Sequence, residues 1–506
     1  MINLKKLQNG SDIRGVAMEG VVGEPITLDE TISGAMGAAF ISWLSTKTGK
    51  PWNQLTIAIG HDSRITAPKL KDALIDSISS MGVHVFDCGL SSTPSMFMST
   101  IFPEFACQGA IMITASHLPF NRNGFKFFDK SGGLDKGDIS QLITLSENFL
   151  AVGFPKKQTG KIIQADIIAS YSDFLKEKIK TQVNHPTHFQ QPLLGLKIIV
   201  DAGNGAGGFY ATQVLEPLGA VITGSQFLDP DGTFPNHIPN PEDKTAMASI
   251  SKAVKVHHAD FGLIFDTDVD RSSAVDKFGH EINRNAIVAL AAALVAETHP
   301  GTTIVTDSVT SDQLSNFIEG HLGCVHHRFK RGYKNVINES IRLNKEGTDS
   351  QLAIETSGHA ALKENYFLDD GAYLATKIVI KAAKLKLEGK TLDRLIEDLE
   401  QPAQSKEIRI PILTDQFAEY GDKVISDLEL FAHVGPGMRV VMPNYEGVRI
   451  AFDKDNGNGW CLLRKSLHDP IMPLNMESNS PHGCEIIAGI LKNFLKDYDQ
   501  LDLQKL

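Results

Sequence analysis

The sequence predicts an α/β protein with three similar α/β domains built on mixed sheets, followed by a smaller C-terminal α+β domain. Three observations support this fold class. The chain has 506 residues, which is more than one hydrophobic core normally supports. A strand–helix–strand pattern recurs three times along it. After about Gln401 that pattern is replaced by short strand-like runs and one closing amphipathic helix.

Each copy of the repeated pattern begins with a short β-branched run that ends near an aspartate. A small polar loop, a stretch with helical apolar spacing, a glycine and a second β-rich run follow. A glycine before the second strand suits the end of a helix. The three copies are LTIAIGHDSRITAPKLKDALIDSISSMGVHVFDCG (55–89), LKIIVDAGNGAGGFYATQVLEPLGAVITG (196–224) and TTIVTDSVTSDQLSNFIEGHLGCVHHRF (302–329).

The three copies predict three domains, and the changed pattern after about Gln401 predicts a fourth. In the last of them, SKEIRIPI, GVRIAFDKDNGNGWCLLRKS and PIMPLNMES are typical of strands, and GCEIIAGILKNFLKDYDQL is typical of a closing helix. The expected domain limits are 1–158, 159–290, 291–402 and 403–506.

Charge and composition exclude several classes of partner. The formal net charge of −11 argues against a nucleic-acid or anionic-membrane surface built on bulk charge. The five cysteines are scattered and form no CxxC pair, which indicates a reducing compartment and no structural zinc. The longest apolar run, AIVALAAALVA (286–296), is too short to span a bilayer. We expect a cytoplasmic monomer or homodimer with no nucleic-acid and no membrane partner.

The stretch ITASHLPFNRNGFKFF (113–128) places Ser116, His117 and Lys126 on what reads as a tight loop between two strand-like runs. Loops held by rigid flanks often carry chemistry. A serine in a turn is more often only a turn former, so this stretch alone does not decide.

The stretch FGLIFDTDVDRSSAVD (261–276) delivers Asp266, Asp268 and Asp270 directly after an apolar strand. Three carboxylates so close together repel one another, and a hard divalent cation such as Mg²⁺ relieves the repulsion. The alternatives are a solvated acidic turn, or the DxD motif of haloacid-dehalogenase phosphotransferases with Asp266 as the nucleophile. Against the second alternative, the motif lies in mid-chain and Asp270 occupies a position where that family has Thr or Val.

Three further stretches have competing interpretations. DAGNGAGG (201–208) follows the spacing of a dinucleotide-binding loop, but the next run, AVITGSQ, lacks the acidic residue such a site needs, which favours a structural turn. ETSGHAAL (355–362) can bracket sugar hydroxyls or form a simple turn. LLRKSLHDP (462–470) can bind a phosphate group or form an edge strand with protective charges.

Taken in order, the motifs GSDIRG, GHDSR, TASHLPFNRNGFK, DGTFPNHIPNPE, DTDVDR, ETSGH and RKSLHDP resemble those of the α-D-phosphohexomutases, the phosphoglucomutase/phosphomannomutase superfamily. The resemblance covers nearly the whole chain. It implies four domains around one central cleft, with one loop each for phosphoserine, metal, sugar and phosphate. It also implies a Mg²⁺-dependent interconversion of hexose 1-phosphate and hexose 6-phosphate through a phosphoserine, with hexose 1,6-bisphosphate as activator.

The resemblance implies roles for individual residues. The catalytic set is Ser116, Lys126, His117 and Arg14, with the proton acceptor left open between Lys126 and His117. The metal ligands are Ser116, Asp266, Asp268 and Asp270. The substrate contacts are Arg271, Glu355, Ser357, His359, Arg331 and Lys334. The residues that hold the non-reacting phosphate are Arg464 and Ser466.

The sequence departs from the family pattern in four loops. Thr267 and Val269 stand where the metal loop usually has glycine, Leu118 replaces Asn in the serine loop, and Ile354 replaces a glycine before the sugar loop. The phosphate loop carries Leu467, His468 and Asp469 in place of a Gly-Thr-Glu run. Three other functions stay under consideration. They are a phosphoglucosamine mutase, which would differ at the sugar loop, an aspartate-nucleophile sugar-phosphate phosphatase that uses Asp266, and a non-catalytic sugar-phosphate-binding paralogue, which the altered phosphate loop favours.

Overall fold

The computed structural model describes residues 3–154, 159–466 and 469–506. The chain forms two compact units, Met1–Leu294 with Ser357–Glu397, and Val295–Thr356 with Asp398–Leu506. Two residues of the altered phosphate loop, Leu467 and His468, lie outside the described residues.

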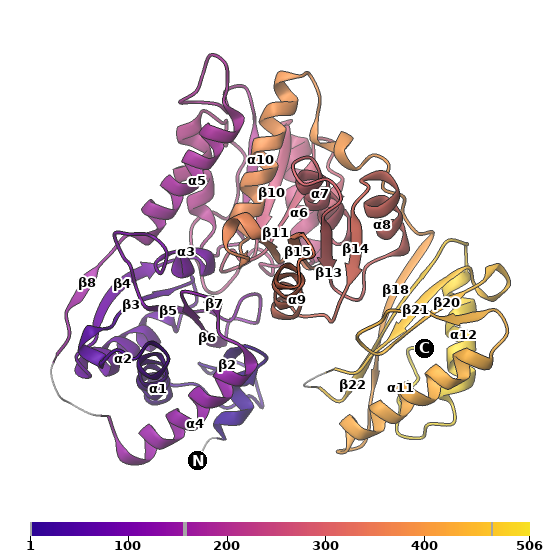
Figure 1. The fold of residues 1–506 in the computed structure, drawn as a ribbon, viewed down its shortest axis with the longest axis horizontal. Coiled ribbons are helices and arrows are strands. Elements are labelled where there is room, and N and C mark those ends of the chain that lie inside the picture. Colours follow the sequence, from indigo (N-terminus) through magenta and orange to yellow (C-terminus); the bar gives the residue numbers. More distant parts are fainter. Residues whose placement is uncertain (1–2, 155–158, 467–468) are drawn as a thin grey trace. The chain divides into compact units, whose positions relative to one another are not determined.

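The first sheet of the larger unit is mixed, with strand order β1-β2-β6-β5-β3-β4-β8 and β7 beside β6 (Figure 1). Strands β3, β4 and β5 are parallel neighbours, whereas β6 is antiparallel to both β5 and β2. The strands are β1 Gln8–Asn9, β2 Asp12–Val16, β3 Thr56–His61, β4 His84–Leu90, β5 Gly109–Ile113, β6 Arg122–Asp129, β7 Gly132–Gly133 and β8 Ile162–Gln164. The helices that accompany them are α1 Glu30–Thr48, α2 Ala67–Ser80, α3 Thr93–Met98 and α4 Lys136–Val152.

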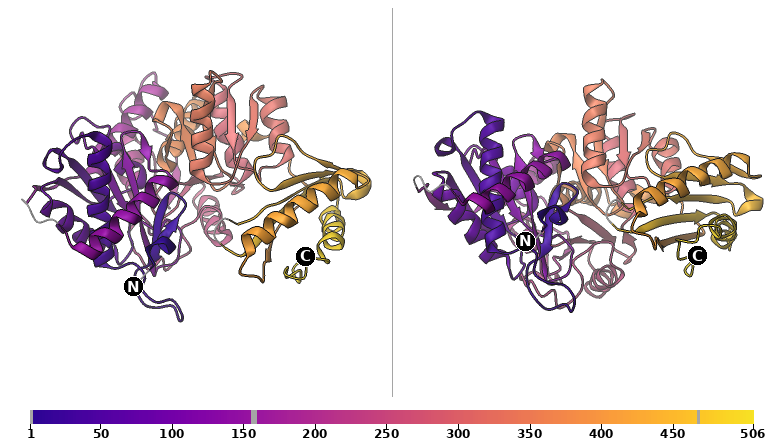
Figure 2. Two further views of the ribbon diagram at one scale, coloured as in Figure 1. Left: turned by 60° about the horizontal axis from the view of Figure 1, so that its bottom comes forward. Right: turned by 90° about the horizontal axis from the view of Figure 1, so that it is seen from below.

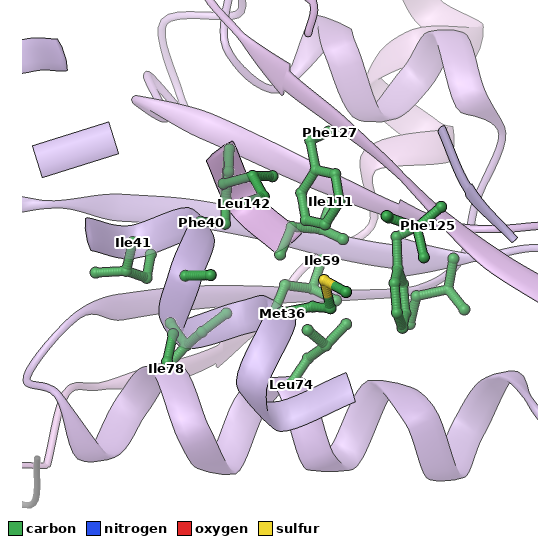
Figure 3. Close-up of a cluster of buried hydrophobic side chains, with 14 of the residues drawn as sticks. Met36, Phe40, Ile41, Ile59, Leu74, Ile78, Ile111, Phe125, Phe127 and Leu142 are labelled. Carbon is green, nitrogen blue, oxygen red and sulfur yellow. The ribbon is translucent and has the colours of Figure 1, made fainter. Parts of the chain in front are cut away.

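The core of this domain lies where α1, α2 and α4 meet the sheet (Figure 3). Helix α1 begins at the Asp29 cap, whose carboxylate accepts a hydrogen bond from the Ile32 amide, and ends at the left-handed Gly49. It is apolar on most sides because α2 and α4 both pack against it. Burial of each large apolar side chain contributes about 1.5–3 kcal/mol. The labelled core residues are Met36, Phe40, Ile41, Ile59, Leu74, Ile78, Ile111, Phe125, Phe127 and Leu142.

The second sheet of the larger unit has strand order β12-β11-β10-β9. Its strands are β9 Ile198–Asp201, β10 Phe261–Phe265, β11 Ser272–Asp276 and β12 Glu281–Ile282. A short antiparallel pair, β16 and β17, also belongs to this unit. The remaining elements are α5 Ile167–Val183, a wide-turn helical segment Tyr210–Leu215, α6 Lys244–His257, β16 Ala360–Leu362, β17 Leu368–Asp369 and α10 Gly371–Leu387. Helix α7, Asn285–Ala296, leads out of it.

The second copy of the repeat lacks the strand predicted after Gly219. Only two isolated bridges form there, from Val221 to Lys197 and from Gln226 to Asp201. The chain turns between these bridges, where the Ser225 amide donates a hydrogen bond to the Ile222 carbonyl at 2.9 Å. A continuous strand is therefore interrupted, and that part of the repeat prediction is wrong.

The smaller unit contains three parallel strands of a mixed sheet and an antiparallel sheet. Strand β13 pairs in parallel with β14 and β15, and the five C-terminal strands follow the order β18-β22-β21-β20-β19. Its first elements are β13 Thr303–Thr306, α8 Asp312–Asn316, β14 Val325–Arg328, α9 Tyr333–Lys345 and β15 Ser350–Ile354. The C-terminal elements are β18 Gln404–Pro411, α11 Phe417–Val434, β19 Met438–Val440, β20 Val448–Phe452, β21 Gly459–Leu463, β22 Ile471–Ser478 and α12 Gly483–Leu495.

Helices α11 and α12 share one core with the C-terminal sheet (Figure 2). The predicted closing helix is confirmed as α12, whereas the sequence analysis did not identify α11. The predicted fold class, three α/β domains followed by an α+β domain, is confirmed, and the four domain limits remain a prediction. Among helices of the described residues, none combines the length and apolar composition needed to cross a bilayer.

Candidate active site

The predicted serine loop connects β5 to β6. Ser116 is 1% exposed, and its φ of 49° lies in the left-handed region that few residues other than glycine adopt. The Ser116 amide donates a hydrogen bond to the Thr114 hydroxyl at 2.8 Å, which fixes the turn just after the strand. The loop therefore holds its serine in an uncommon backbone conformation, a feature that often accompanies a functional position.

Lys126 does not lie on this loop but within strand β6, so the prediction that placed it on the loop is wrong. Strand β6 already begins at Arg122, because residues 122–125 pair with β2 while residues 125–129 pair with β5. Gly124 is opposite Arg14, and Lys126 is opposite Met112. Strand β2 supplies hydrogen bonds that keep this turn-like sequence extended, and it comes from a part of the chain more than 100 residues earlier.

The predicted metal loop leaves β10 at Phe265 and brings three carboxylates together. Asp266, Asp268 and Asp270 are fully buried, and each offers an oxygen within 4.8 Å of the others. Between them, Val269 has a φ of 68°, which is a strained conformation for a β-branched residue. The carbonyl of Val269 accepts a hydrogen bond from the Gly371 amide at 3.1 Å, a contact that supports this conformation.

The serine loop and the metal loop are in direct contact. The Ser116 hydroxyl donates to Oδ2 of Asp266 at 2.9 Å. Arg271 donates to the same Asp266 oxygen from Nε at 3.2 Å, and through Nη2 to Ser116 and to Nδ1 of His117. The ammonium of Lys126 is hydrogen-bonded to Asp270. The structure therefore brings the predicted serine, metal loop, lysine and arginine into one cluster.

The charges in this cluster shift several pKa values. Burial, together with Asp270 and Asp268, raises the pKa of Asp266 well above its usual value. Burial also acts to raise the pKa of Asp270, but Lys126, His359 and Arg271 outweigh it and lower that pKa. Burial, Arg271 and Arg14 lower the pKa of His117 to about 2, so its imidazole stays neutral near neutral pH.

The donor set of the acidic trio fits a magnesium ion. Oδ1 of Asp268 and Oδ1 of Asp270 are buried and have no hydrogen-bond partner within the described parts of the chain. Buried carboxylate oxygens without a donor are costly, and oxygen ligands of this kind are those that Mg²⁺ prefers. The residues that would hold the ion are Asp266, Asp268 and Asp270, with Ser116 beside them.

His359 lies beside the acidic trio. Its Nδ1 is 2.5 Å from Oδ2 of Asp369 and 3.9 Å from Oδ1 of Asp270. The residue opposite Arg271 in an isolated bridge is also His359. The sequence analysis placed His359 near the sugar contacts and did not identify Asp369 as its partner.

Thr93 is a second residue that the sequence analysis missed. Its hydroxyl donates to Oδ2 of Asp268 at 2.5 Å, and its amide donates to the Asp268 carbonyl at 2.8 Å. Thr93 is buried at the start of α3, 175 residues away from Asp268 along the chain. The hydrogen bond orients Asp268 and leaves its other oxygen for a metal ion.

Replacing Thr93 with valine is expected to weaken Mg²⁺ binding roughly 10-fold, because the partners that orient a metal ligand typically contribute 10- to 100-fold to affinity. The measurement is the Mg²⁺ dissociation constant by calorimetry. Thr100→Val is the matched control, since Thr100 is equally buried just after α3 and donates only to the Phe97 carbonyl. Equal Mg²⁺ affinity in the two variants would contradict the expectation.

The glycine-rich stretch DAGNGAGG lies against the metal loop. A Cβ atom on Gly205 would lie 2.6 Å from the Thr267 carbonyl oxygen, so only glycine permits this approach. The Gly205 position therefore supports the interpretation of this stretch as a structural turn that packs under the metal loop.

Two of the remaining predicted residues in the smaller unit, Arg331 and Arg464, lie beside the carboxylate of Glu446. Glu355 accepts a hydrogen bond from the Gly332 amide at 2.6 Å, next to Arg331. Glu446 accepts one from the Arg331 amide at 2.9 Å and lies 3.5 Å from Nη1 of Arg464. Lys334 is in the first turn of α9.

Arg464 and Ser466 follow strand β21, which lies in the middle of its sheet. The interpretation of this stretch as an edge strand is therefore wrong. The Ser466 amide donates to the Ile471 carbonyl at 3.0 Å, and its hydroxyl accepts from the Asp469 amide at 3.2 Å. Ser357, the last of the predicted substrate contacts, belongs to the larger unit and is buried.

Three sequence models of known families match this chain. They describe the phosphoglucomutase/phosphomannomutase alpha/beta/alpha domains I, II and III, and they match residues 5–146, 169–279 and 283–402. Together they account for most of the chain, in the order in which the three α/β domains occur.

Individual relatives agree with this match. The phosphomannomutase/phosphoglucomutase of Pseudomonas syringae pv. tomato is 31% identical over 448 residues, which is 88% of each chain. That of Pseudomonas aeruginosa is 29% identical over 494 residues, or 97% of this chain and 96% of the other. A crystal structure of a phosphoglucomutase/phosphomannomutase family protein from Burkholderia thailandensis superposes with a TM-score of 0.78 at 26% identity, covering 98% of both chains. The resemblance seen in the motifs is thus confirmed, and the chain belongs to the phosphoglucomutase/phosphomannomutase family of α-D-phosphohexomutases.

Proposed function

We propose that this protein interconverts hexose 1-phosphate and hexose 6-phosphate through a phosphorylated Ser116 and a bound bisphosphate. The observation that carries the proposal is the position of the Ser116 hydroxyl, 2.9 Å from Asp266 within the buried carboxylate trio. Family membership favours this activity over an aspartate-nucleophile phosphatase. The proposed compartment is the cytoplasm, and the proposed assembly is a monomer or homodimer, as the sequence predicts.

In the proposed cycle, phosphorylated Ser116 gives its phosphoryl group to a free hydroxyl of a hexose monophosphate. The Oγ–P bond breaks and a P–O bond to the sugar forms, while Lys126 or His117 relays the proton from the sugar hydroxyl to the freed Oγ of Ser116. The resulting bisphosphate turns over, and its other phosphate returns to Ser116. Hexose 1,6-bisphosphate acts as an activator because it can phosphorylate a bare Ser116.

Phosphoryl transfer depends on in-line positioning and on neutralisation of charge more than on new covalent chemistry. Arg271, which donates to the Ser116 hydroxyl, supplies a positive charge at the reacting atom. The ammonium of Lys126 supplies a second positive charge, and it lies 3.3 Å from Oδ2 of Asp268 in the trio. A Mg²⁺ ion held by the trio supplies further neutralisation of the transferring group.

Sugar recognition is assigned to Glu355, Ser357 and His359, with Arg331 and Lys334 as further substrate contacts and Arg14 near the reacting phosphate. The Arg14 guanidinium donates to the Ala115 carbonyl at 3.1 Å, directly before Ser116, which supports a place beside the reacting group. The buried carboxylate of Glu355 provides a hydrogen-bond acceptor of the kind that sugar hydroxyls need.

The proposed function is tested by a panel of glucose, mannose and glucosamine 1-phosphates, each with Mg²⁺ and a trace of the matching bisphosphate. Formation of the 6-phosphate is the expected result, and the best substrate identifies the sugar; preference for glucosamine 1-phosphate identifies a phosphoglucosamine mutase. Absence of turnover on every member would instead indicate a non-catalytic sugar-phosphate-binding protein. A hydroxylamine-sensitive phosphate on Asp266 would indicate a phosphatase.

Arg464 is assigned to the non-reacting phosphate together with Ser466. Replacing Arg464 with alanine is expected to raise KM for the hexose phosphate roughly 10- to 100-fold, because hydrogen bonds to charged groups contribute about 1.5–3 kcal/mol. Steady-state kinetics measure the change. The control is Lys465→Ala, because the neighbouring Lys465 ammonium binds Asp422 and the Ala418 carbonyl of α11 instead. A similar KM in both variants would remove Arg464 from the phosphate site.

A further inference from the structure

The motif GHDSR, which the proposed function leaves without a role, places a buried arginine under the serine loop. Arg64 follows β3 and precedes α2, and it is 1% exposed. A fully buried guanidinium is costly unless its donors and its charge are both satisfied. Its partners therefore show what this residue is there to hold.

In the part of the chain that the structure describes, Nη1 and Nη2 of Arg64 donate four hydrogen bonds, all to main-chain carbonyls within residues 116–122. Nη1 donates to the carbonyls of Pro119 and Arg122, each at 2.8 Å. Nη2 donates to the carbonyls of Ser116 and Leu118, each at 2.5 Å. One side chain thus joins both ends of the turn that carries Ser116.

Asp62 holds this guanidinium in place and ties it to the strand that leads into the loop. Oδ2 of Asp62 is 3.4 Å from Nε of Arg64, and its Oδ1 accepts the Arg64 amide at 2.9 Å. The Asp62 amide donates to the carbonyl of Ile113, the last residue of β5, at 3.1 Å. The pair Asp62–Arg64 therefore spans from the start of the serine loop to its end.

The stretch DGTFPNHIPNPE covers Arg64 from the second domain of the same unit. The ring of Phe234 lies over the guanidinium, 5.2 Å from its carbon. A Cβ atom on Gly232 would lie 2.5 Å from the Ser63 carbonyl oxygen, so glycine is needed for this segment to approach so closely. The cover keeps water away from the hydrogen bonds under the loop.

The shape of the guanidinium explains why an arginine stands here. It presents five donors in a rigid planar fork, whereas a lysine ammonium has three donors on a flexible stem. Four carbonyls spread over residues 116–122 can be held by the fork and not by the ammonium. The left-handed conformation of Ser116 costs on the order of 1–3 kcal/mol and persists only where its surroundings enforce it.

We propose that Arg64 is a positioning residue for phosphoryl transfer, which fixes the Ser116 loop so that the serine oxygen faces the carboxylate trio. This assignment rests on the proposed function. Within the described residues, the guanidinium of Arg64 hydrogen-bonds to carbonyls of the loop and not to the hydroxyl of Ser116 or the trio. It therefore acts through the main chain of the loop.

The test compares wild-type protein with Arg64→Lys, which keeps the charge but removes the fork. The expected result is a fall in kcat of roughly 10²-fold with KM within about twofold, because a misplacement of about 1 Å costs a reaction of this kind that much. Amide hydrogen exchange is expected to rise at residues 114–122 and to stay unchanged in the strands of the second sheet.

Leu74→Ala is the matched control for stability. Leu74 is fully buried in α2 and belongs to the hydrophobic core of the same domain, not to the serine loop. A fall in kcat that follows only the loss of thermal stability, as in Leu74→Ala, would overturn the proposal. So would unchanged hydrogen exchange at residues 114–122. If Arg64→Lys does not fold, Phe234→Ala takes its place, with an expected fall in kcat of roughly fivefold from the lost cation–π contact.

Turnover by the wild-type protein separates a failure of this proposal from a failure of the proposed function. If the wild-type protein turns over no hexose phosphate, the mutase assignment fails, and Arg64 is then not a positioning residue for that reaction. If the wild-type protein is active, and Arg64→Lys retains full kcat and unchanged hydrogen exchange at residues 114–122, only the role proposed for Arg64 is wrong.

Discussion

Replacing Ser116 with alanine is expected to lower mutase turnover by at least roughly 10³-fold, since removing a covalent nucleophile leaves only binding and electrostatic effects. The hydroxyl lies 2.9 Å from Asp266 and also accepts from Arg271, and alanine can make neither contact. The measurement is conversion of the preferred hexose 1-phosphate, with intact-mass analysis for a phosphoryl group on the protein.

Ser140→Ala provides the control for this substitution. Ser140 is an exposed serine on α4 of the same domain, and surface substitutions of this kind usually change stability by less than about 0.5 kcal/mol. We expect the Ser140→Ala variant to keep full turnover, and we expect its Ser116 to accept a phosphoryl group from the bisphosphate. Turnover retained by Ser116→Ala would remove the phosphoserine from the mechanism.

Replacing Asp268 with asparagine is expected to weaken Mg²⁺ binding by roughly 10²-fold or more, because it removes one of three charged oxygen ligands. In the wild-type protein, Mg²⁺ at about 100 times its Kd stabilises the folded state by about 2.7 kcal/mol. In the variant most of that gain is expected to disappear. The measurement is the Mg²⁺-dependent rise in Tm, recorded with and without a chelator, together with turnover.

Asp129→Asn is the matched control, since Asp129 is a buried aspartate of β6 that binds Lys47 and Ser131 outside the trio. Its thermal stability is expected to fall, but the rise on adding Mg²⁺ is expected to match that of the wild-type protein. An undiminished Mg²⁺ effect in Asp268→Asn would show that the trio is not the metal site.

The parts of the site that are local in sequence were predictable. The spacing of Asp266, Asp268 and Asp270 after an apolar strand brought three carboxylates to one place, as the pattern predicted. The serine loop between two strands was also correctly located from its apolar flanks. In both cases the relevant geometry is set within a few residues, by a strand end and a turn.

The parts that depend on distant partners were not predictable. Thr93 and Asp268 are 175 residues apart, and Arg64 and Ser116 are 52 residues apart. Nothing within a short window shows that such pairs meet. Lys126 was assigned to a loop for the same reason, because its strand is completed by β2 from the start of the chain.

Helix α11 was missed although its signal is local. Its buried residues Val424, Leu428 and Ala432 follow a four-residue spacing, which is typical of one helical face. The interrupted strand after Gly219 is the opposite case, because β-rich composition was present and the turn at residues 222–225 decided the outcome. The β-rich composition alone therefore did not predict that the strand is interrupted by a turn.

The Ser116 hydroxyl lies between an acceptor and a donor, since it donates to Asp266 and accepts from Arg271. A side chain that can only donate or only accept would leave one of these two buried neighbours without its partner. The position therefore requires a hydroxyl group, and the left-handed backbone disfavours the β-branched threonine as a replacement for serine.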